Sequence, residues 1–201
     1  CPQGWNYVFV GVTHMADQTY TDCEGIVTGK VTVVGATPRV AEKPYLVHDE
    51  DSSGNETWSI YVPAFMGNGS SGATRDHAAA AARKLDVDTE VFVATPGHSA
   101  EEINAGARGK RGLLLTPGTY TLSSPIVVDR DHFVVLGLGF STLISTSGRS
   151  ALRVAPGLRG VRIAGILLEA GTPKDHGNAT EPLLRWGDAA EQDRGAPAHE
   201  D

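Results

Sequence analysis

Two acidic residues that flank an arginine are the first candidates for chemistry in this chain. Asp129 and Asp131 lie on either side of Arg130 in a short polar segment. Paired carboxylates are the groups that hydrolyse glycosidic bonds, one acting as an acid and the other as a base or nucleophile. A polar segment of this composition between two apolar runs is also typical of a solvated turn, and we favour that interpretation for this pair.

Two further acids lie later in the chain and are our candidate catalytic residues. Glu169 follows an apolar run and precedes Gly171, and Asp175 is followed by His176 in the next predicted loop. If Glu169 faces a groove, its carboxylate is suited to binding hydroxyl groups. The alternative is a carboxylate on the rim of the fold with no chemical role. The same alternative holds for Asp175.

Other motifs predict no cofactor. The histidines show no metal-ligand spacing, so we expect no zinc site. Gly137-Leu138-Gly139 lacks the third glycine of a dinucleotide-binding fingerprint and predicts a turn that needs small residues. The segment 109–112 contains Lys110 and Arg111 but lacks the spacing of a phosphate-binding loop, which indicates an exposed basic turn. For the three tryptophans we weigh stacking on a sugar ring against packing in the core or a cap: Trp5, Trp58 and Trp186.

Composition and charge exclude some classes of partner. The formal net charge is −7, so we expect no nucleic-acid partner. No apolar run approaches the roughly 20 residues that span a bilayer. Glycine accounts for 24 of 201 residues and aromatic residues for only 6%. Because glycine is usually near 7%, this composition favours many turns and a closely stacked backbone.

The first third of the chain reads as a β-rich region, 1–66. Short alternating segments predict strands at 5–10, 30–34, 42–47 and 57–62. The acidic, turn-rich segment 49–55 predicts an exposed turn between the last two. We interpret 67–98 as a linker or insertion. Within it, residues 78–84 favour either a surface helix or a disordered segment, and Val91–Ala94 predicts a short strand.

A short helix and a series of very short strands follow. Ser99 and Glu102 have the spacing of a capping box, which predicts a helix over residues 99–107. From Gly112 onward, apolar runs of strand length are separated by Gly, Pro, Ser or Asp. An offset of 27 residues pairs Val127 with Val154, Val134 with Val161 and Leu136 with Ile163. That spacing favours a right-handed parallel β-helix, an all-β fold of stacked coils, over a β-sandwich with longer strands.

The segment after Thr95 resembles the opening of pectate-lyase-superfamily β-helices. Its matching blocks are Ala100–Gly106, Leu113–Tyr120 and Ser124–Ile126. In that superfamily a short helix caps the first coils, and the same opening occurs in glycoside hydrolase family 55 β-1,3-glucanases and in phage tailspikes. Thr116 stands where the superfamily usually has proline. Lyases of the superfamily use Ca²⁺-binding carboxylates with a basic residue.

A wider resemblance links this chain to secreted multidomain proteins often labelled adenylyl cyclase or coagulation factor 5/8 type. It is carried by blocks at 40–45, 115–118, 134–143, 160–171 and 183–187. The chain shows neither a paired metal-binding aspartate motif nor a nucleotide loop, so we expect no cyclase activity. These relatives are longer, and the chain begins with Cys1 rather than Met, so we expect an N-terminal fragment.

The resemblances together imply a secreted, extracellular, carbohydrate-active β-helix protein with a polysaccharide partner. The first hypothesis is a glycoside hydrolase that acts on a β-glucan-like polymer, with catalytic residues beyond this chain. The alternative is a noncatalytic solenoid that binds glycans or has a structural role. Whether this chain is an enzyme stays open at this point.

Two expectations concern the ends of the chain. Cys1 and Cys23 are its only cysteines, and in a secreted protein we expect them to form a disulfide. Closing a loop of about 20 residues contributes about 3 kcal/mol. The capping helix and first coils are expected to occupy 99–187. The polar tail 188–201 is expected to be disordered or to begin an insertion.

Overall fold

A computed structural model describes residues 7–10, 31–35, 41–50, 53–65, 83–172 and 181–187. The chain divides into two compact units. One contains Cys1–Glu42 and Val62–Arg83, and the other contains Lys43–Tyr61 and Lys84–Asp201. Each unit is described by itself below.

The first unit contains a small parallel sheet. Strands β1 (Tyr7–Val10) and β2 (Val31–Val34) pair with Tyr7 opposite Val31. Both strands are rich in valine, whose branched side chain suits a pleated surface. They lie inside two segments that the sequence predicts as strands, which confirms those predictions.

A three-stranded sheet begins the second unit. Its strands lie in the order β3 (Tyr45–Glu50), β4 (Glu56–Val62) and β5 (Arg83–Asp86). Strands β3 and β4 are antiparallel, with the Tyr45 and Tyr61 rings stacked at 5.8 Å between centroids. The intervening turn is exposed, as predicted, and includes Gly54 at φ +81°.

Strand β5 corrects the expectation of a helix or disordered segment through residue 84. Residues 78–82 lie outside the described part of the chain, but Arg83 and Lys84 are extended. The Lys84 ammonium lies 2.9 Å from the Asp49 carboxylate, and Leu85 is fully buried. These tertiary contacts override the weak local preference for helix.

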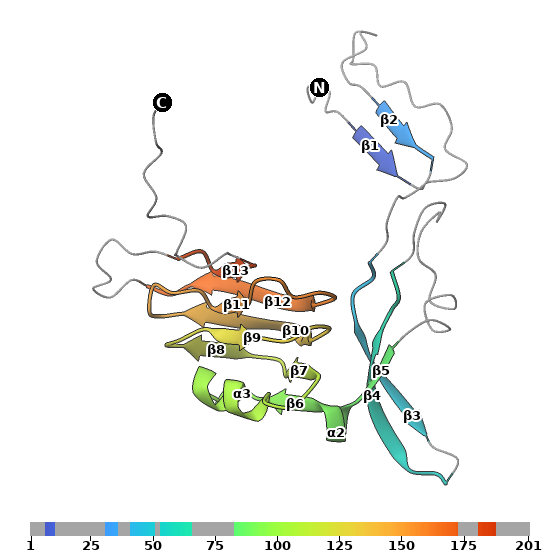
Figure 1. Cartoon of the computed structure of the whole chain (residues 1–201), viewed down its shortest axis with the longest axis horizontal. Coiled ribbons are helices and arrows are strands. Elements are labelled where there is room, and N and C mark those ends of the chain that lie inside the picture. The colour runs from blue at the N-terminus through green and yellow to red at the C-terminus, as the bar shows by residue number, and fades with distance from the viewer. Residues whose placement is uncertain are drawn as a thin grey trace. The chain divides into compact units, whose positions relative to one another are not determined.

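The rest of the second unit is a right-handed parallel β-helix, as expected (Figure 1). Its larger sheet contains β6 (Val91–Ala94), β7 (Gly112–Leu115), β8 (Thr119–Leu122), β10 (Val134–Ser145) and β12 (Arg162–Ala170). Its smaller sheet contains β9 (Ile126–Val128), β11 (Leu152–Val154) and β13 (Leu184–Trp186). Neighbouring strands in both sheets run parallel. The β-sandwich alternative is therefore wrong.

The register of the coils differs from the predicted offset by one residue at each predicted pair. Val127 pairs with Arg153, 26 residues further on. Val134 pairs with Arg162, 28 residues further on. The predicted offset of 27 lies between these two spacings. A single offset fails because the two sheets connect successive coils through turns of different length.

A bulge in β10 interrupts the register within the larger sheet. Residues Gly137–Phe140 of β10 lie opposite the single residue Gly165 of β12. A Cβ on Gly137 would lie 2.4 Å from the Gly165 carbonyl oxygen, and one on Gly165 would lie 2.2 Å from the Gly137 carbonyl oxygen. Glycine at both positions lets the two backbones approach this closely. The small-residue turn predicted at 137–139 is thus confirmed, as part of this bulge.

Helix α3 (Ala100–Gly106) covers the β6 end of the stack, as Figure 1 shows. The Ser99 hydroxyl accepts from the Glu102 amide at 3.2 Å, and the Glu102 carboxylate accepts from the Ser99 amide at 2.7 Å. The predicted capping box is therefore confirmed. Asn104 then ties the helix to the first coil, since it donates to the Pro125 carbonyl at 2.9 Å and accepts from the Val127 amide at 2.8 Å.

The interior of the solenoid is filled by apolar side chains from successive coils. Those buried to within 2% exposure include Ile103, Leu113, Leu115, Tyr120, Leu122, Ile126, Val135, Leu143 and Leu152. Strand β6 belongs to this sheet although it lies inside 67–98, the span interpreted as linker or insertion. The proposed domain boundaries themselves stay a prediction.

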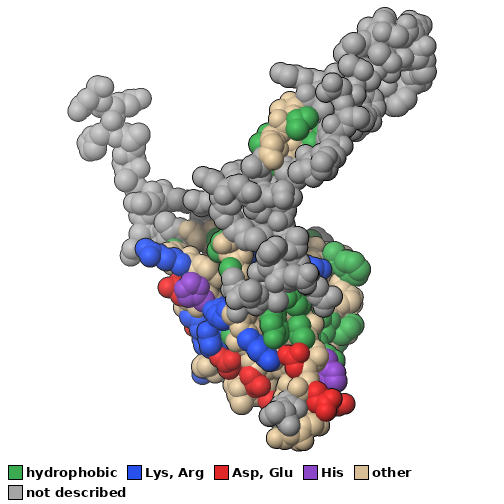
Figure 2. All heavy atoms as spheres, turned by 90° about the vertical axis from the view of Figure 1, so that its right-hand side faces the viewer, with side chains coloured by type: hydrophobic (Ala, Val, Ile, Leu, Met, Phe, Trp, Pro, Cys, Tyr) green, Lys and Arg blue, Asp and Glu red, His purple; other side chains and the backbone are tan. Residues whose placement is uncertain are grey.

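Charge and apolar length can be examined on the described residues. On the face shown in Figure 2, basic and acidic side chains are interspersed rather than segregated. Among the described residues, no helix is long and apolar enough to cross a membrane.

Candidate functional site

The candidate site lies on the outer face of the sheet made by β8, the second half of β10, and β12. Along β8, Tyr120 and Leu122 are buried in the core while Thr119 and Thr121 are exposed. Successive side chains of a strand point to opposite faces. The alternating sequence therefore places the threonines on the outer face of the coil.

The parallel register aligns this outer face into two rows. Thr119, Thr142 and Leu167 form one row. Thr121, Ile144 and Glu169 form the other. We refer to these six residues as the open face. Each row crosses three successive coils, so a ligand lying along it would contact side chains from all three.

A hollow lies at the Glu169 end of the open face. It is lined by Thr121, Ile144, Thr146, Glu169, Ala170, Gly171 and Thr172. The Gly171 amide donates to the Ser145 carbonyl at 2.8 Å, and a Cβ at Gly171 would lie 2.7 Å from that oxygen. Glycine thus allows the end of β12 to lie tightly against β10 beside the hollow.

The side chains of the hollow suit a neutral ligand rich in hydroxyl groups. Three threonine hydroxyls and one carboxylate offer donors and acceptors, and Ile144 offers an apolar surface. Glu169 is the single carboxylate among the lining residues. Glycoside hydrolysis needs a second carboxyl group or an activated water, so the described part of this hollow supports binding more directly than bond cleavage. Within the described residues, no three potential metal ligands are grouped together.

The structure places Asp129 and Asp131 in a turn and away from a catalytic arrangement. The Asp129 carboxylate pairs with Arg130 at 2.9 Å. The Asp131 carboxylate accepts from the backbone amide of Arg159 at 2.7 Å, and the His132 amide donates to the Arg159 carbonyl at 2.7 Å. Asp131 therefore joins the turns of two successive coils. The turn interpretation of this pair is confirmed.

Several predicted site residues lie outside the described part of the chain. Asp175 is one of them, so the structure does not place it beside Glu169. Cys1 and Cys23 also lie outside it, and their disulfide stays a prediction. The same holds for Trp5.

The two described tryptophans are both outside the core. Trp58 is 47% exposed and its ring lies 4.6 Å from that of His48. Trp186 is 51% exposed at the end of β13. Core packing is thus the wrong interpretation for both.

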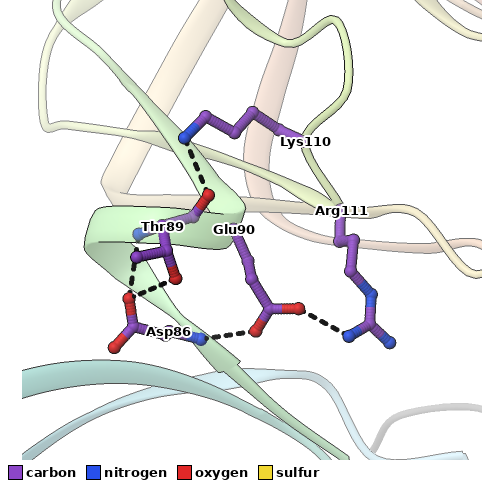
Figure 3. Close-up of polar contacts among 5 residues, drawn as sticks. All are labelled: Asp86, Thr89, Glu90, Lys110 and Arg111. Atoms are coloured by element: carbon purple, nitrogen blue, oxygen red, sulfur yellow. Dashed lines mark hydrogen bonds and ion pairs between the residues drawn. The ribbon is translucent and has the colours of Figure 1, made fainter.

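The basic turn at 109–112 has a structural role (Figure 3). It follows helix α3 and faces the short helix α2 (Val87–Glu90). The Lys110 ammonium donates to the Thr89 carbonyl at 2.8 Å, and the Arg111 guanidinium pairs with Glu90 at 2.5 Å. Both cations are engaged by the preceding coil, which agrees with the interpretation that this turn is not a phosphate-binding loop.

The acids in this network are stabilised in their charged forms. The Asp86 backbone amide and the Arg111 guanidinium hold the pKa of Glu90 below its ordinary value. The Thr89 hydroxyl and amide do the same for the pKa of Asp86, whose carboxylate caps α2. Because hydrogen bonds to a carboxylate favour its ionised state, these groups add to stability above the usual carboxyl range.

Sequence reasoning found Glu169 but missed the rest of the open face and Phe140. The strict alternation of residues 119–122 was the signal for the outward threonines. Phe140 follows Gly139 directly in the β10 bulge, and its side chain is 74% exposed. Apolar residues in a strand are expected to be buried, so the sequence alone gave no sign of this exposure.

Comparison with known proteins reveals a family and a solved fold. Residues 91–200 match the family described as the LAM55 pectate lyase-like domain. An exo-β-1,3-glucanase of Streptomyces sp. (strain SirexAA-E / ActE) is 35% identical over 167 residues, which covers 83% of this chain and 25% of the glucanase.

Two solved structures from the same Streptomyces agree with the fold. The structure of sacteLam55A gives a TM-score of 0.72 at 32% identity, covering 98% of this chain and 32% of that chain. A glutamate-to-alanine variant of sacteLam55A in complex with glucose gives 0.69 at 32% identity, covering 92% and 31%. This chain therefore spans about a third of those chains and a quarter of the glucanase.

Proposed function

Since the chain belongs to the LAM55 pectate lyase-like domain family, we propose that it contributes a β-helix domain to a glycoside hydrolase that acts on a β-glucan-like polysaccharide. The observation that carries this proposal is the 35% identity to an exo-β-1,3-glucanase over 83% of the chain. The open face supports it, because it offers hydroxyls, a carboxylate and apolar surface along a track that crosses three coils.

Glu169 is the residue of this chain that we assign to the substrate. In the hydrolase reading, its carboxylate accepts hydrogen bonds from sugar hydroxyls beside Thr121 and Thr172. The open face lacks a second carboxylate among its described residues. We therefore assign Glu169 to binding and place the acid–base pair elsewhere in the enzyme.

A noncatalytic solenoid that binds glycans is the second candidate. The observation that favours it is the same single carboxylate, since binding a neutral sugar needs no acid–base pair. The two candidates make the same prediction for binding and opposite predictions for hydrolysis.

The experiment measures reducing-sugar release by the naturally produced polypeptide that contains this chain. The substrates are a panel of soluble β-1,3-, β-1,4- and mixed-linkage glucans. We expect release from a β-1,3-linked polymer. Binding without release on any polymer favours the solenoid, and neither binding nor release overturns both candidates.

A Glu169→Gln variant tests the assignment of that residue. As a binding group, Glu169 affects KM and leaves kcat nearly unchanged. If kcat instead falls about 100-fold or more, Glu169 is an acid–base residue and our assignment is wrong. Glu56→Gln on strand β4 is a matched control, because Glu56 is exposed and lies on the separate β3–β4 hairpin.

We also propose that the protein acts outside the cell. Support comes from the polymeric nature of the proposed substrate, which does not cross a membrane. Detection of the chain by mass spectrometry in the culture medium of its source, and its absence from washed cells, tests this localisation.

A further inference from the structure

Phe140 combines an exposed aromatic ring with an unusual backbone conformation. Its φ angle is +58°, in the left-handed region that non-glycine residues seldom adopt. Its side chain is 74% exposed, the largest exposure among the described large hydrophobic residues. Within the described residues, the ring takes part in no aromatic or cation–π contact. Neither the strain nor the exposure is explained by packing inside the molecule.

The backbone around Phe140 is held firmly in this conformation. The buried Ser141 hydroxyl lies within hydrogen-bond distance of three carbonyl oxygens, those of Leu115 at 3.0 Å and of Thr116 and Leu138 at 2.9 Å. On the outer side, the Thr142 hydroxyl donates to the Phe140 carbonyl at 3.1 Å. The ring is therefore presented from a fixed support and not from a loose loop.

The bulge places Phe140 at one end of the open face. Thr142, two residues later, belongs to the row with Thr119 and Leu167, and the next row ends at Glu169. From Ser141 to Ile144 the strand advances about 10 Å. Leu167 on the same face is 49% exposed. The surface thus runs from an aromatic ring, past threonine hydroxyls and exposed aliphatic groups, to a carboxylate.

This order of groups fits a chain of neutral sugar rings. A β-glucosyl ring has an apolar face of C–H groups that packs against an aromatic ring, and equatorial hydroxyls that meet polar side chains at its edge. The length of the track exceeds one ring, so the fit is to an oligosaccharide or polymer and not to a monosaccharide.

We propose that Phe140 is a platform on which a glucosyl ring of the polysaccharide stacks, and that it holds the polymer along the open face toward Glu169. This inference rests on the proposed function for the class of ligand. It adds to that function a specific binding residue, which contacts the polymer away from the bond that is cleaved.

The test measures the affinity of the full chain for a soluble β-1,3-glucan by calorimetry and by retardation in a glucan-containing gel. Phe140→Ala is expected to weaken binding about fivefold to tenfold, the loss of one aromatic stacking contact. Phe140→Trp, which restores an aromatic face, is expected to stay within about twofold of wild type. Phe65→Ala is the matched control, because Phe65 is also exposed and belongs to the other unit of the chain.

Ligand length gives a second readout that a merely structural role would not move. We expect the loss in Phe140→Ala to appear with the polymer and to vanish with glucose. Phe140→Gly removes the ring and relieves the backbone, so it shows whether weak binding comes from the missing ring or from a damaged fold.

Three outcomes overturn the platform: equal polymer affinity for wild type and Phe140→Ala, equal loss in Phe65→Ala, or failure of Phe140→Trp to restore binding. Failure of the proposed function is distinguished by the wild-type measurements. A wild-type polypeptide that hydrolyses glucan while Phe140→Ala binds normally retains its function and lacks the platform. A wild type that neither binds nor hydrolyses glucan loses both.

Discussion

The two halves of β10 belong to one strand but differ in the number of faces they bury. In the first half, Val134, Val135 and Leu136 are all buried, so both faces of the sheet are covered. In the second half, Leu143 is buried while Ile144 is only partly so. The first half contributes to the fold alone, whereas the second half combines a buried inner face with an outer face that is free to bind.

The difference arises from what lies over the outer face. In the first half, Leu85 of β5 reaches the sheet, since a Cβ on Gly112 would lie 3.4 Å from its side chain. The bulge at Gly137–Phe140 then ends this doubly covered part of the strand. The comparison teaches that a binding surface on a solenoid is made by leaving a cover off, and that the sequence marks the point with glycines.

The largest effect that separates inner from outer face is expected at two adjacent residues. Leu143→Ala removes a fully buried side chain from the core and is expected to lower the free energy of unfolding by about 2–5 kcal/mol. Ile144→Ala, on the outer face, is expected to cost less than about 1 kcal/mol. Urea denaturation of both variants measures this, and equal losses would contradict the assignment of faces.

The boundary between the two halves is expected to be the next most sensitive position. In Gly137→Ala the new Cβ would lie 2.4 Å from the Gly165 carbonyl, so the strands must separate, at an expected cost of about 1–3 kcal/mol. Gly97→Ala is the control, because nothing lies within 4 Å of its Cβ position. Thermal unfolding compares the two, and an unchanged Tm in Gly137→Ala would show that the bulge is not a close backbone contact.

At the end of the bulge, a substitution is expected to stabilise the protein. Phe140→Gly releases a left-handed L-residue and is expected to raise the free energy of unfolding by about 1 kcal/mol. Phe140→Ala keeps the strained conformation and should show no such gain. Chemical denaturation of both variants tests this, and a loss of stability in Phe140→Gly would mean that the ring packs against the fold.

The smallest expected effect is the pH dependence of the doubly covered region. Hydrogen bonds hold the pKa of Glu90, and of Glu102 in the capping box, below the ordinary value. The unfolded chain therefore binds protons at a higher pH than the folded chain, so stability is present above the ordinary carboxyl pKa and is lost as pH falls through the lowered values. Tm measured from pH 7 to pH 3 should fall, and less steeply in Glu90→Gln than in wild type. Parallel curves would show that Glu90 makes no contribution.

Local patterns with a direct physical cause were predictable from the sequence. The capping box at Ser99, the turn at 137–139 and the outward position of Asp129 each depend on neighbouring residues only. The parallel β-helix also followed, because short strands at nearly constant spacing need stacked coils to bury their apolar sides.

What escaped prediction depends on contacts between distant segments. The register was wrong by one residue because β10 carries Gly137–Phe140 opposite a single glycine of β12. Lys84 is extended because Asp49, far away in sequence, pairs with it. Phe140 was missed because its exposure follows from the backbone geometry of the bulge, which no local periodicity reveals.

The clamp that Asn104 forms between α3 and the first coil gives the solenoid a direction of growth. A stack of parallel coils has two ends, and each end carries strand edges able to template another coil, from the same chain or from a neighbouring molecule. With the β6 end closed by a helix, coils are added or duplicated only on the β12 and β13 side. Lengthening of such a protein in evolution, and its pairing with other strands during folding, therefore proceed from one side alone.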